Sequence, residues 1–505
     1  MWATRDPAGA RAAGGVERVQ IRTLAVPADV CKDQSETDSS ATPEWVSHVT
    51  AQRSETADAD PERVADAVVE RATAVDDGFD GLVDGISDAD VVLLGEASHG
   101  TSEYYRLRAR LTARLLEEHD FSFVAVEGDW TDCYEVTEYV TGRTEADDAG
   151  AVLADFERWP TWMWANWEVA EFLDWLAEYN ADRPVGERAG FYGLDVYSLY
   201  ESMAAVIDYL QELDPELADR ARDAYHCFEP YGEDAREYAS SIRLVPEDCE
   251  DEVLEVLREL REEVAERHAD RVDDRSESAD GDDPLADFAA EQNALVAKNA
   301  ESYYRAMARG GRESWNVRDH HMSETLERLL EFHDGPGIVW AHNTHVGDAR
   351  ATTMQDRGKL NLGQLAREEV CDDDSDVAAV GFGSHRGTVV AGDEWGARME
   401  RMTVPEAKAG SYEDVFHRAG LEDGILEFDR GYGVAGDANV DPLADPRGHR
   451  AIGVVYDPDY EGGNYVRTVL PDRYDAFVHV DETEALHPFD IEGGETPPET
   501  YPWGV

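Results

Sequence analysis

The sequence predicts an α/β protein, a three-layer α/β/α architecture with a mainly parallel sheet. Short apolar runs such as Val91–Leu94 recur along the chain, and each ends in a cluster of polar residues. Most of these runs are followed by helical periodicity, and strands that alternate with helices in this way are typical of a sheet buried on both faces. With 505 residues, 42% of them hydrophobic, the chain is long enough to bury a sizeable core.

Five apolar runs predict the central strands in chain order. They are "VVLL" (91–94), "FSFVAV" (121–126), "AGFYGL" (189–194), "GPGIVW" (335–340) and "DVAAVGFG" (376–383). The polar residues that follow them are Glu96 and His99, Glu127 and Asp129, Asp195, His342 with Asn343 and His345, and Ser384 with His385. Because ligands bind outside the carboxyl ends of parallel strands, these residues describe one edge of a cleft.

Helical patterns fill the middle of the chain and define the expected domain organisation. The charge-laced stretches 164–180 and 246–271 read as amphipathic helices. The predicted parts are a disordered N-terminal tail (1–42), an α/β domain (43–490) with a mostly helical insertion that caps the cleft (198–330) and an exposed acidic loop (267–288), and a Pro/Gly-rich tail (491–505).

The charge balance is strongly acidic, with a formal net charge of −66 at pH 7. A field of this sign repels nucleic acid and anionic membrane surfaces, so we expect neither as a partner. A folded protein with an acidic, strongly hydrated surface is typical of salt-loving organisms, where molar salt screens the self-repulsion. The partner that we expect is instead a small molecule.

The cysteines and the apolar runs limit the class of protein further. Five cysteines are scattered without C-x-x-C spacing, which predicts neither a disulfide framework nor a thiolate zinc site. No apolar run approaches 18 residues, and the N-terminus lacks a signal-peptide core. We therefore expect a cytoplasmic protein.

The loop Gly95–Gly100, "GEASHG", carries the first candidate site. Its glycines have the spacing of a phosphate-binding loop, but Thr101 stands where that motif needs lysine, and Glu96 would repel phosphates. No G-x-S-x-G occurs in the chain, which excludes an ordinary serine nucleophile elbow. The remaining interpretation is a Glu96/His99 site that activates water.

Further along the chain, an arginine and a second motif complete the candidate site. In the helical pattern after the loop, Arg108 lies in the middle of the apolar face, where an arginine needs an anionic partner such as Glu96 or Glu127. "WAHNTH" places His342 and His345 three residues apart after a strand. Arg318 and Asp319 read as a helix-start ion pair rather than ligand contacts.

These segments together resemble the erythromycin esterase family, with "LLGEASHGTSEYYRLRARL", "FVAVEGDW", "FYGLDVYSLY", "RDHHM" and "IVWAHNTHVGD" matching in order. The resemblance implies a three-layer α/β/α fold and hydrolysis of macrolide lactones by activated water, without a covalent serine intermediate. It carries functional roles onto Glu96, His99, Arg108, Glu127, His342 and His345. Asp195, Asn343 and Trp164 are the expected substrate contacts, although Asp195 also suits a turn cap and Trp164 also suits the core.

With the activity that the resemblance implies, these residues predict hydrolysis of an ester or macrolactone bond in an apolar small-molecule ester or lactone by histidine-activated water, with no cofactor. Two alternatives stay open. A divalent metal held by Glu96, His99, Glu127 and His342 would lower the pKa of a bound water. A family member without turnover would bind a glycan or a lipid-like ligand.

Overall fold

The computed structural model describes residues 60–75, 79–231, 249–273, 283–309, 312–371, 373, 376–428 and 441–489. The chain divides into two units, Met1–Ala57 and Asp58–Val505, and the fold belongs to the second. The predicted tails 1–42 and 491–505 and the predicted domain start at residue 43 lie outside the described residues.

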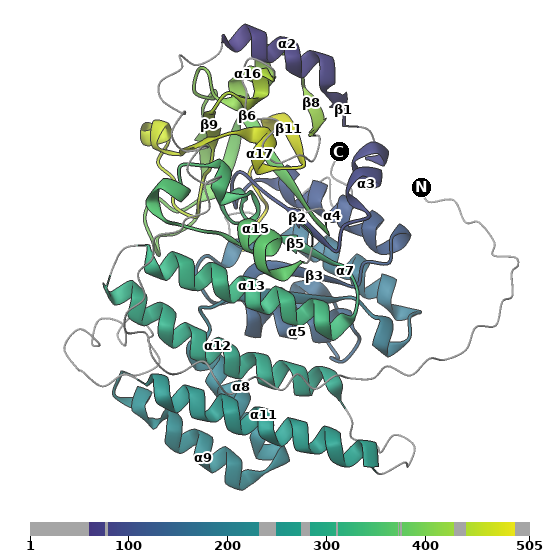
Figure 1. Ribbon diagram of the computed structural model, residues 1–505, viewed down its shortest axis with the longest axis vertical. Coiled ribbons are helices and arrows are strands. Elements are labelled where there is room, and N and C mark those ends of the chain that lie inside the picture. Colours follow the sequence, from purple (N-terminus) through teal and green to yellow (C-terminus); the bar gives the residue numbers. More distant parts are fainter. Residues whose placement is uncertain are drawn as a thin grey trace, which may run out of the picture. The chain divides into compact units, whose positions relative to one another are not determined.

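A nine-stranded sheet forms the centre of the domain, in the order β1-β8-β11-β6-β2-β5-β3-β4 with β7 beside β6 (Figure 1). Its strands are β1 (Thr73–Ala74), β2 (Val91–Leu94), β3 (Phe123–Asp129), β4 (Gly190–Asp195), β5 (Gly337–Trp340), β6 (Val377–Ala391), β7 (Glu400–Val404), β8 (Asp423–Glu427) and β11 (Ala476–Thr483). The strands from β11 to β4 pair in parallel, whereas β1, β7 and β8 pair antiparallel. The predicted mainly parallel sheet is confirmed.

Helices cover both faces of the sheet, which gives the three layers. Alternate side chains of a strand point to opposite faces, and Val92 and Leu94 pack with α4 and α7, whereas Val91 and Leu93 pack with α2, α13 and α16. The helices outside the insertion are α2 (Pro61–Arg71), α3 (Asp80–Ile86), α4 (Ser102–Glu118), α5 (Trp130–Val140), α6 (Ala149–Leu153), α7 (Trp167–Ala181), α14 (Asn343–Val346), α15 (Leu362–Leu365), α16 (Tyr412–Arg418) and α17 (Leu470–Arg473). Two short strands, β9 (Arg447–Arg450) and β10 (Tyr465–Thr468), pair separately.

The region between β4 and β5 is helical, as the fold prediction expects. It contains α8 (Leu199–Leu213), α9 (Pro215–Tyr225), α11 (Glu250–Asp273), α12 (Pro284–Arg309) and α13 (Glu313–His333). The helices α8, α9, α11 and α12 enclose a hydrophobic cluster of their own and extend from the β4 side of the sheet (Figure 1). In contrast, α13 packs on the sheet, and this places its first turns near the strand ends.

Two features differ from the sequence predictions. The acidic stretch 267–288 does not form a loop throughout, because α11 continues to Asp273 and α12 begins at Pro284. At the start of α12, Asp283 accepts hydrogen bonds from the backbone N–H groups of Leu285 and Ala286, and Leu285 packs in the core, so an acidic residue here caps a helix. Cys227 and Cys249 form a disulfide, so the scattered spacing was a poor guide to pairing. Cys133 is buried and forms no disulfide.

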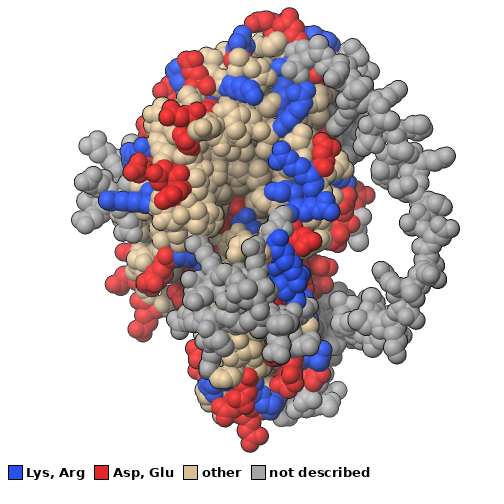
Figure 2. Space-filling model, turned by 90° about the vertical axis from the view of Figure 1, so that its left-hand side faces the viewer, with Lys and Arg blue, Asp and Glu red and all other residues tan. Residues whose placement is uncertain are grey.

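The surface reflects the acidic composition of the chain. On the face shown in Figure 2, acidic side chains are prominent along the rim, and a largely uncharged area surrounds a hollow. In the part of the chain that the structure describes, no helix is long and apolar enough to cross a membrane.

Candidate active site

The loop after β2 is fixed by its two glycines. A Cβ atom at Gly95 would collide with the Asn343 side chain, and one at Gly100 would collide with the backbone of Val390 in β6. The chain therefore passes close to β5 and β6 and presents Glu96 and His99 at the carboxyl end of the sheet. Helix α4 begins at Ser102, immediately after this loop.

Glu96, His99 and Arg108 form a first buried cluster. Glu96 Oε1 lies 2.8 Å from His99 Nδ1, and Arg108 Nη2 donates to Glu96 Oε2 at 2.7 Å. The Arg108 side chain is fully buried, as predicted for an arginine on the apolar face of the helix. Because the carboxylate that Arg108 binds only accepts hydrogen bonds, Nδ1 of His99 donates to it, and a neutral His99 has its lone pair on Nε2.

His342, the N-cap of α14, faces His99 with 4.8 Å between the ring centroids. The backbone N–H of Thr344 donates to His342 Nδ1 at 3.3 Å, and the hydroxyl of Thr344 lies 2.8 Å from the same atom. A neutral His342 therefore carries its proton on Nε2, which is buried. Burial, reinforced by His99, holds the pKa of His342 well below its usual range, so the ring is neutral at neutral pH.

Glu127 anchors a second cluster on the other side of β5. Its Oε2 accepts from the backbone N–H of His342 at 2.8 Å, and its Oε1 accepts from Arg318 Nη2 at 2.7 Å. Arg318 also donates to both carboxylate oxygens of Asp195, at 2.8 and 2.6 Å. Burial alone would raise the pKa of Glu127, but His345 and Arg318 outweigh it and hold that pKa well below its usual range.

His345 connects this cluster to α13. Its Nδ1 lies 2.8 Å from Asp319 Oδ1, and Arg318 Nη1 donates to its Nε2 at 3.0 Å. Its ring stacks on Trp315 at 4.6 Å. Burial lowers the pKa of His345, but Asp319 and Glu127 outweigh burial and raise it. Protonation of Nε2 would exchange the Arg318 contact for one with Glu127 Oε1, which lies 3.4 Å away.

The three predicted substrate contacts occupy different environments. Asp195 is buried at the end of β4 and is engaged by Arg318. The amide of Asn343 is fully buried, donates to the Phe382 carbonyl at 2.6 Å and lies 3.2 Å from His449. Trp164 packs in the core and donates to the Glu127 carbonyl at 3.2 Å. These positions favour support of the site over direct contact with a substrate.

Sequence reasoning missed Arg318, Asp319 and Trp315 as site residues. Arg318 and Asp319 do not pair with each other as a helix-start ion pair. Instead, each binds a residue from a strand end, Arg318 with Asp195 and Asp319 with His345. The available signal was the "RD" of "RDHHM" on a helix that precedes β5 directly, but the pattern gave no direction for either side chain.

The donor set is a poor fit to a divalent metal. Both glutamates of the predicted metal set are bound by arginines, Glu96 by Arg108 and Glu127 by Arg318, and a guanidinium disfavours a second cation at the same oxygens. Among the described residues, no group of three or more His, Cys, Asp or Glu side chains has an arrangement that could hold a metal ion.

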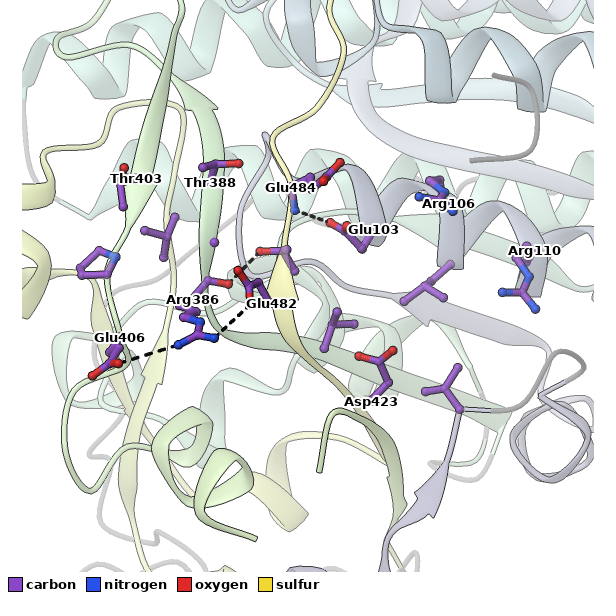
Figure 3. A pocket seen from close by; sticks show the side chains of 17 residues that line it. Glu103, Arg106, Arg110, Arg386, Thr388, Thr403, Glu406, Asp423, Glu482 and Glu484 are labelled. Atoms are coloured by element: carbon purple, nitrogen blue, oxygen red, sulfur yellow. Dashed lines mark hydrogen bonds and ion pairs between the residues drawn. The ribbon is translucent and has the colours of Figure 1, made fainter. Parts of the chain in front are cut away.

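A separate pocket of about 960 Å³ lies against the outer side of α4 and contains none of these residues (Figure 3). Arg386 extends between Glu482 and Glu406, and Glu103 accepts from the backbone of Glu484. Its charges are in part paired with one another, and it holds no histidine. The predicted site residues lie at the strand ends, away from this pocket.

The fold and the strand-end site define an α/β/α protein with a histidine–carboxylate centre, and comparisons with known proteins specify the family. The family model described as erythromycin esterase matches residues 116–483. The chain therefore belongs to the erythromycin esterase family, and this membership supports a hydrolase. The match includes Glu127, His342 and His345 but begins after Glu96, His99 and Arg108.

Individual relatives are distant. The chain is 22% identical to "Erythromycin esterase type II" of Escherichia coli over 369 residues, 70% of this chain and 84% of the relative. A solved succinoglycan biosynthesis protein has a TM-score of 0.68 at 19% identity, covering 86% of this chain and 100% of its own. A mutant of the erythromycin esterase EreC in its open conformation has a TM-score of 0.56 at 17% identity, covering 80% and 93%. These structures show the fold.

Proposed function

We propose that the chain hydrolyses a carboxylic ester or a macrolactone with water activated by His99. The observation that carries this proposal is the pair of facing imidazoles with opposite roles. Nε2 of His99 has a lone pair because Nδ1 is used on Glu96, whereas Nε2 of His342 has a proton because Nδ1 accepts from Thr344. A general base and a hydrogen-bond donor on two rings whose centroids are 4.8 Å apart suit the attack of water on a carbonyl group.

In this mechanism, His99 Nε2 takes a proton from water while the water oxygen forms a bond to the carbonyl carbon. The carbonyl oxygen becomes an oxyanion and accepts from His342 Nε2–H. The intermediate then breaks its bond to the leaving oxygen, which receives the proton from the His99 imidazolium. Glu96, fixed by Arg108, stabilises that imidazolium. The products are an acid and an alcohol, or a hydroxy acid from a lactone.

The test incubates pure protein at high salt with a 14-membered macrolide and a panel of simple esters and lactones, followed by mass spectrometry. Gain of one water by any compound, lost in His99→Ala, supports the proposal. Turnover that His99→Ala retains contradicts it. A chelator arm tests the metal-dependent alternative, since loss of activity that a divalent ion restores would favour that mechanism.

A further inference from the structure

Trp159 and Trp395 form an apolar surface that is exposed to solvent rather than packed in the core. Trp395 is 56% exposed and stands 4.7 Å from Trp159 between ring centroids. Trp159 is half-buried and donates from Nε1 to the Ala397 carbonyl at 2.8 Å, so its ring orientation is fixed. Val455, 36% exposed, belongs to a segment that pairs with Gly392. In a protein with a net charge of −66, exposed apolar residues that gather in this way mark a binding surface.

The same segments are bonded to the loop that carries His99. Val390 N donates to the Gly100 carbonyl at 3.0 Å, and Ile452 N donates to the Ala97 carbonyl at 2.8 Å. Two residues beyond Val390, Gly392 exchanges backbone hydrogen bonds with Val454 and Tyr456. The two segments that bond to the His99 loop, at Val390 and at Ile452, therefore continue directly into the exposed apolar surface.

A third segment joins this surface to the end of β3. Arg158, next to Trp159, is paired with Asp129, the last residue of β3, and with Glu201 at 2.6 Å. Asp129 lies two residues after Glu127. The two tryptophans are thus attached at one side to the His99 loop and at the other side to the strand that carries Glu127, which puts them at the rim of the candidate site.

We propose that Trp159 and Trp395, with Val455, bind the apolar acyl or alkyl part of the substrate, so that the enzyme selects esters and lactones with long or bulky apolar groups. This inference rests on the proposed function and names the substrate class of that site. Indole rings suit the role because they bring a large flat contact area with little loss of conformational entropy. At the rim they contact the part of a substrate remote from the ester.

The experiment compares p-nitrophenyl acetate with p-nitrophenyl decanoate, using wild type and Trp395→Ala. The measured quantity is the ratio of kcat/KM for decanoate to kcat/KM for acetate, which corrects for any general change in activity. We expect this ratio to fall about ten-fold, the effect of about two methylene groups losing apolar contact. Trp395→Phe, which keeps an aromatic face, should recover most of the ratio. The matched control is Val185→Ser, because Val185 is 65% exposed but lies before the amino end of β4.

The outcomes separate this inference from the proposed function. If His99→Ala abolishes turnover while Trp395→Ala keeps the wild-type ratio, the apolar surface is not the substrate wall and the inference is overturned. If wild type hydrolyses neither ester, calorimetric titration of 2-butanone and of a C10 methyl ketone replaces the kinetics. Preferential binding of the long ketone that Trp395→Ala loses supports the inference, and equal binding by both proteins overturns it. Thermal unfolding verifies that each variant is folded.

Discussion

Two Glu–Arg–His clusters flank β5, and they are built in different ways. β2 and β3 both pair with β5, so Glu96, His342 and Glu127 follow adjacent strands at one edge of the sheet. In the first cluster, Arg108 is 12 residues from Glu96. In the second, Arg318 is 191 residues from Glu127 and comes from α13. The first cluster is local, whereas the second joins the sheet to the helical region.

The clusters also hold different groups. Glu96 contacts the imidazole of His99 directly. Glu127 instead accepts from the backbone N–H of His342, and its contact with His345 is long, 3.4 Å. Under the proposed mechanism, the first cluster therefore orients the base, and the second holds the loop that presents the hydrogen-bond donor. Substitutions in the first should affect chemistry, and those in the second should affect assembly of the site.

The largest expected effect separates the two histidines that contact the glutamates. His99→Ala should lower kcat by up to about 10⁴-fold, the range for a lost general base. His345→Ala removes a group that contacts Asp319, Arg318 and Glu127 in the supporting cluster. The loss of kcat should be about 10-fold, comparable to a lost supporting hydrogen bond to a charged group. Steady-state kinetics on a hydrolysed ester measures both. Equal losses would contradict the division between a catalytic and a supporting cluster.

The next largest effect is on the free energy of unfolding. Here a substitution in the second cluster should cost more than one in the first cluster. Arg318→Met leaves Glu127 and Asp195 without their shared cation, whereas Arg108→Met leaves Glu96 with His99 still beside it. Breaking a buried ion pair costs about 3–5 kcal/mol, so we expect a loss near the upper value for Arg318→Met and a smaller loss for Arg108→Met. Denaturant unfolding gives both free energies. A larger loss in Arg108→Met would show that the local cluster is the structural one.

Asp129, a third carboxyl group, extends the comparison to the pH dependence of stability. Burial raises the pKa of Asp129 from its ordinary 3.8 to about 7, against the charge of Arg158. Because the folded pKa is the higher one, the folded state binds this proton more tightly, so stability from this group is present below about pH 4 and is lost as pH rises to about 7. Asparagine cannot ionise, so the Asp129→Asn variant does not lose stability in this way. The free energy of unfolding of Asp129→Asn relative to that of wild type should therefore increase between about pH 4 and pH 7 and stay constant above pH 7.

The measurement for Asp129 is the midpoint of thermal unfolding across this pH range at constant salt. Asp182→Asn, at an exposed position after α7, is the matched control for loss of one charge. A pH-independent difference between Asp129→Asn and wild type would contradict the direction of the shift. It would also place Asp129 with Glu127, as a carboxylate that arginine keeps ionised.

The contrast between the clusters explains how far the sequence could predict the site. Glu96, His99 and Arg108 lie on one loop and one helix, so strand-end position and helical spacing brought them together in advance. Glu127 and His342 were also found, because each follows an apolar run. Arg318 was misassigned because its partners come from β3 and β4, and pairing between elements so far apart depends on packing that no local pattern encodes.

The same limit applies to the fold. Apolar runs predicted five of the six parallel strands, β2 to β6, because burial on both faces leaves a clear composition signal. They did not include β11, the sixth parallel strand. The antiparallel strands were not predicted, neither β1 and β8 at one end of the sheet nor β7 beside β6, since short strands lack that signal. The stretch 267–288 was assigned to a loop because it is acidic and interrupted by Ser and Gly, although acidic residues also cap helices, as Asp283 does at the start of α12. The Cys227–Cys249 pair depended on how the helices of the insertion pack.

The smallest expected effect tests the proton position on His342. Thr344→Val removes the hydroxyl near Nδ1 but keeps the backbone N–H that donates to the same atom. The tautomer with Nε2–H should survive, and kcat should fall by about 2- to 10-fold, the size of one lost neutral hydrogen bond. The test is kcat for Thr344→Val, with Thr344→Ser as the control that restores the hydroxyl. A loss approaching that of His99→Ala would mean that the hydroxyl, rather than the backbone, fixes the proton, and that the donor role of His342 depends on this side chain.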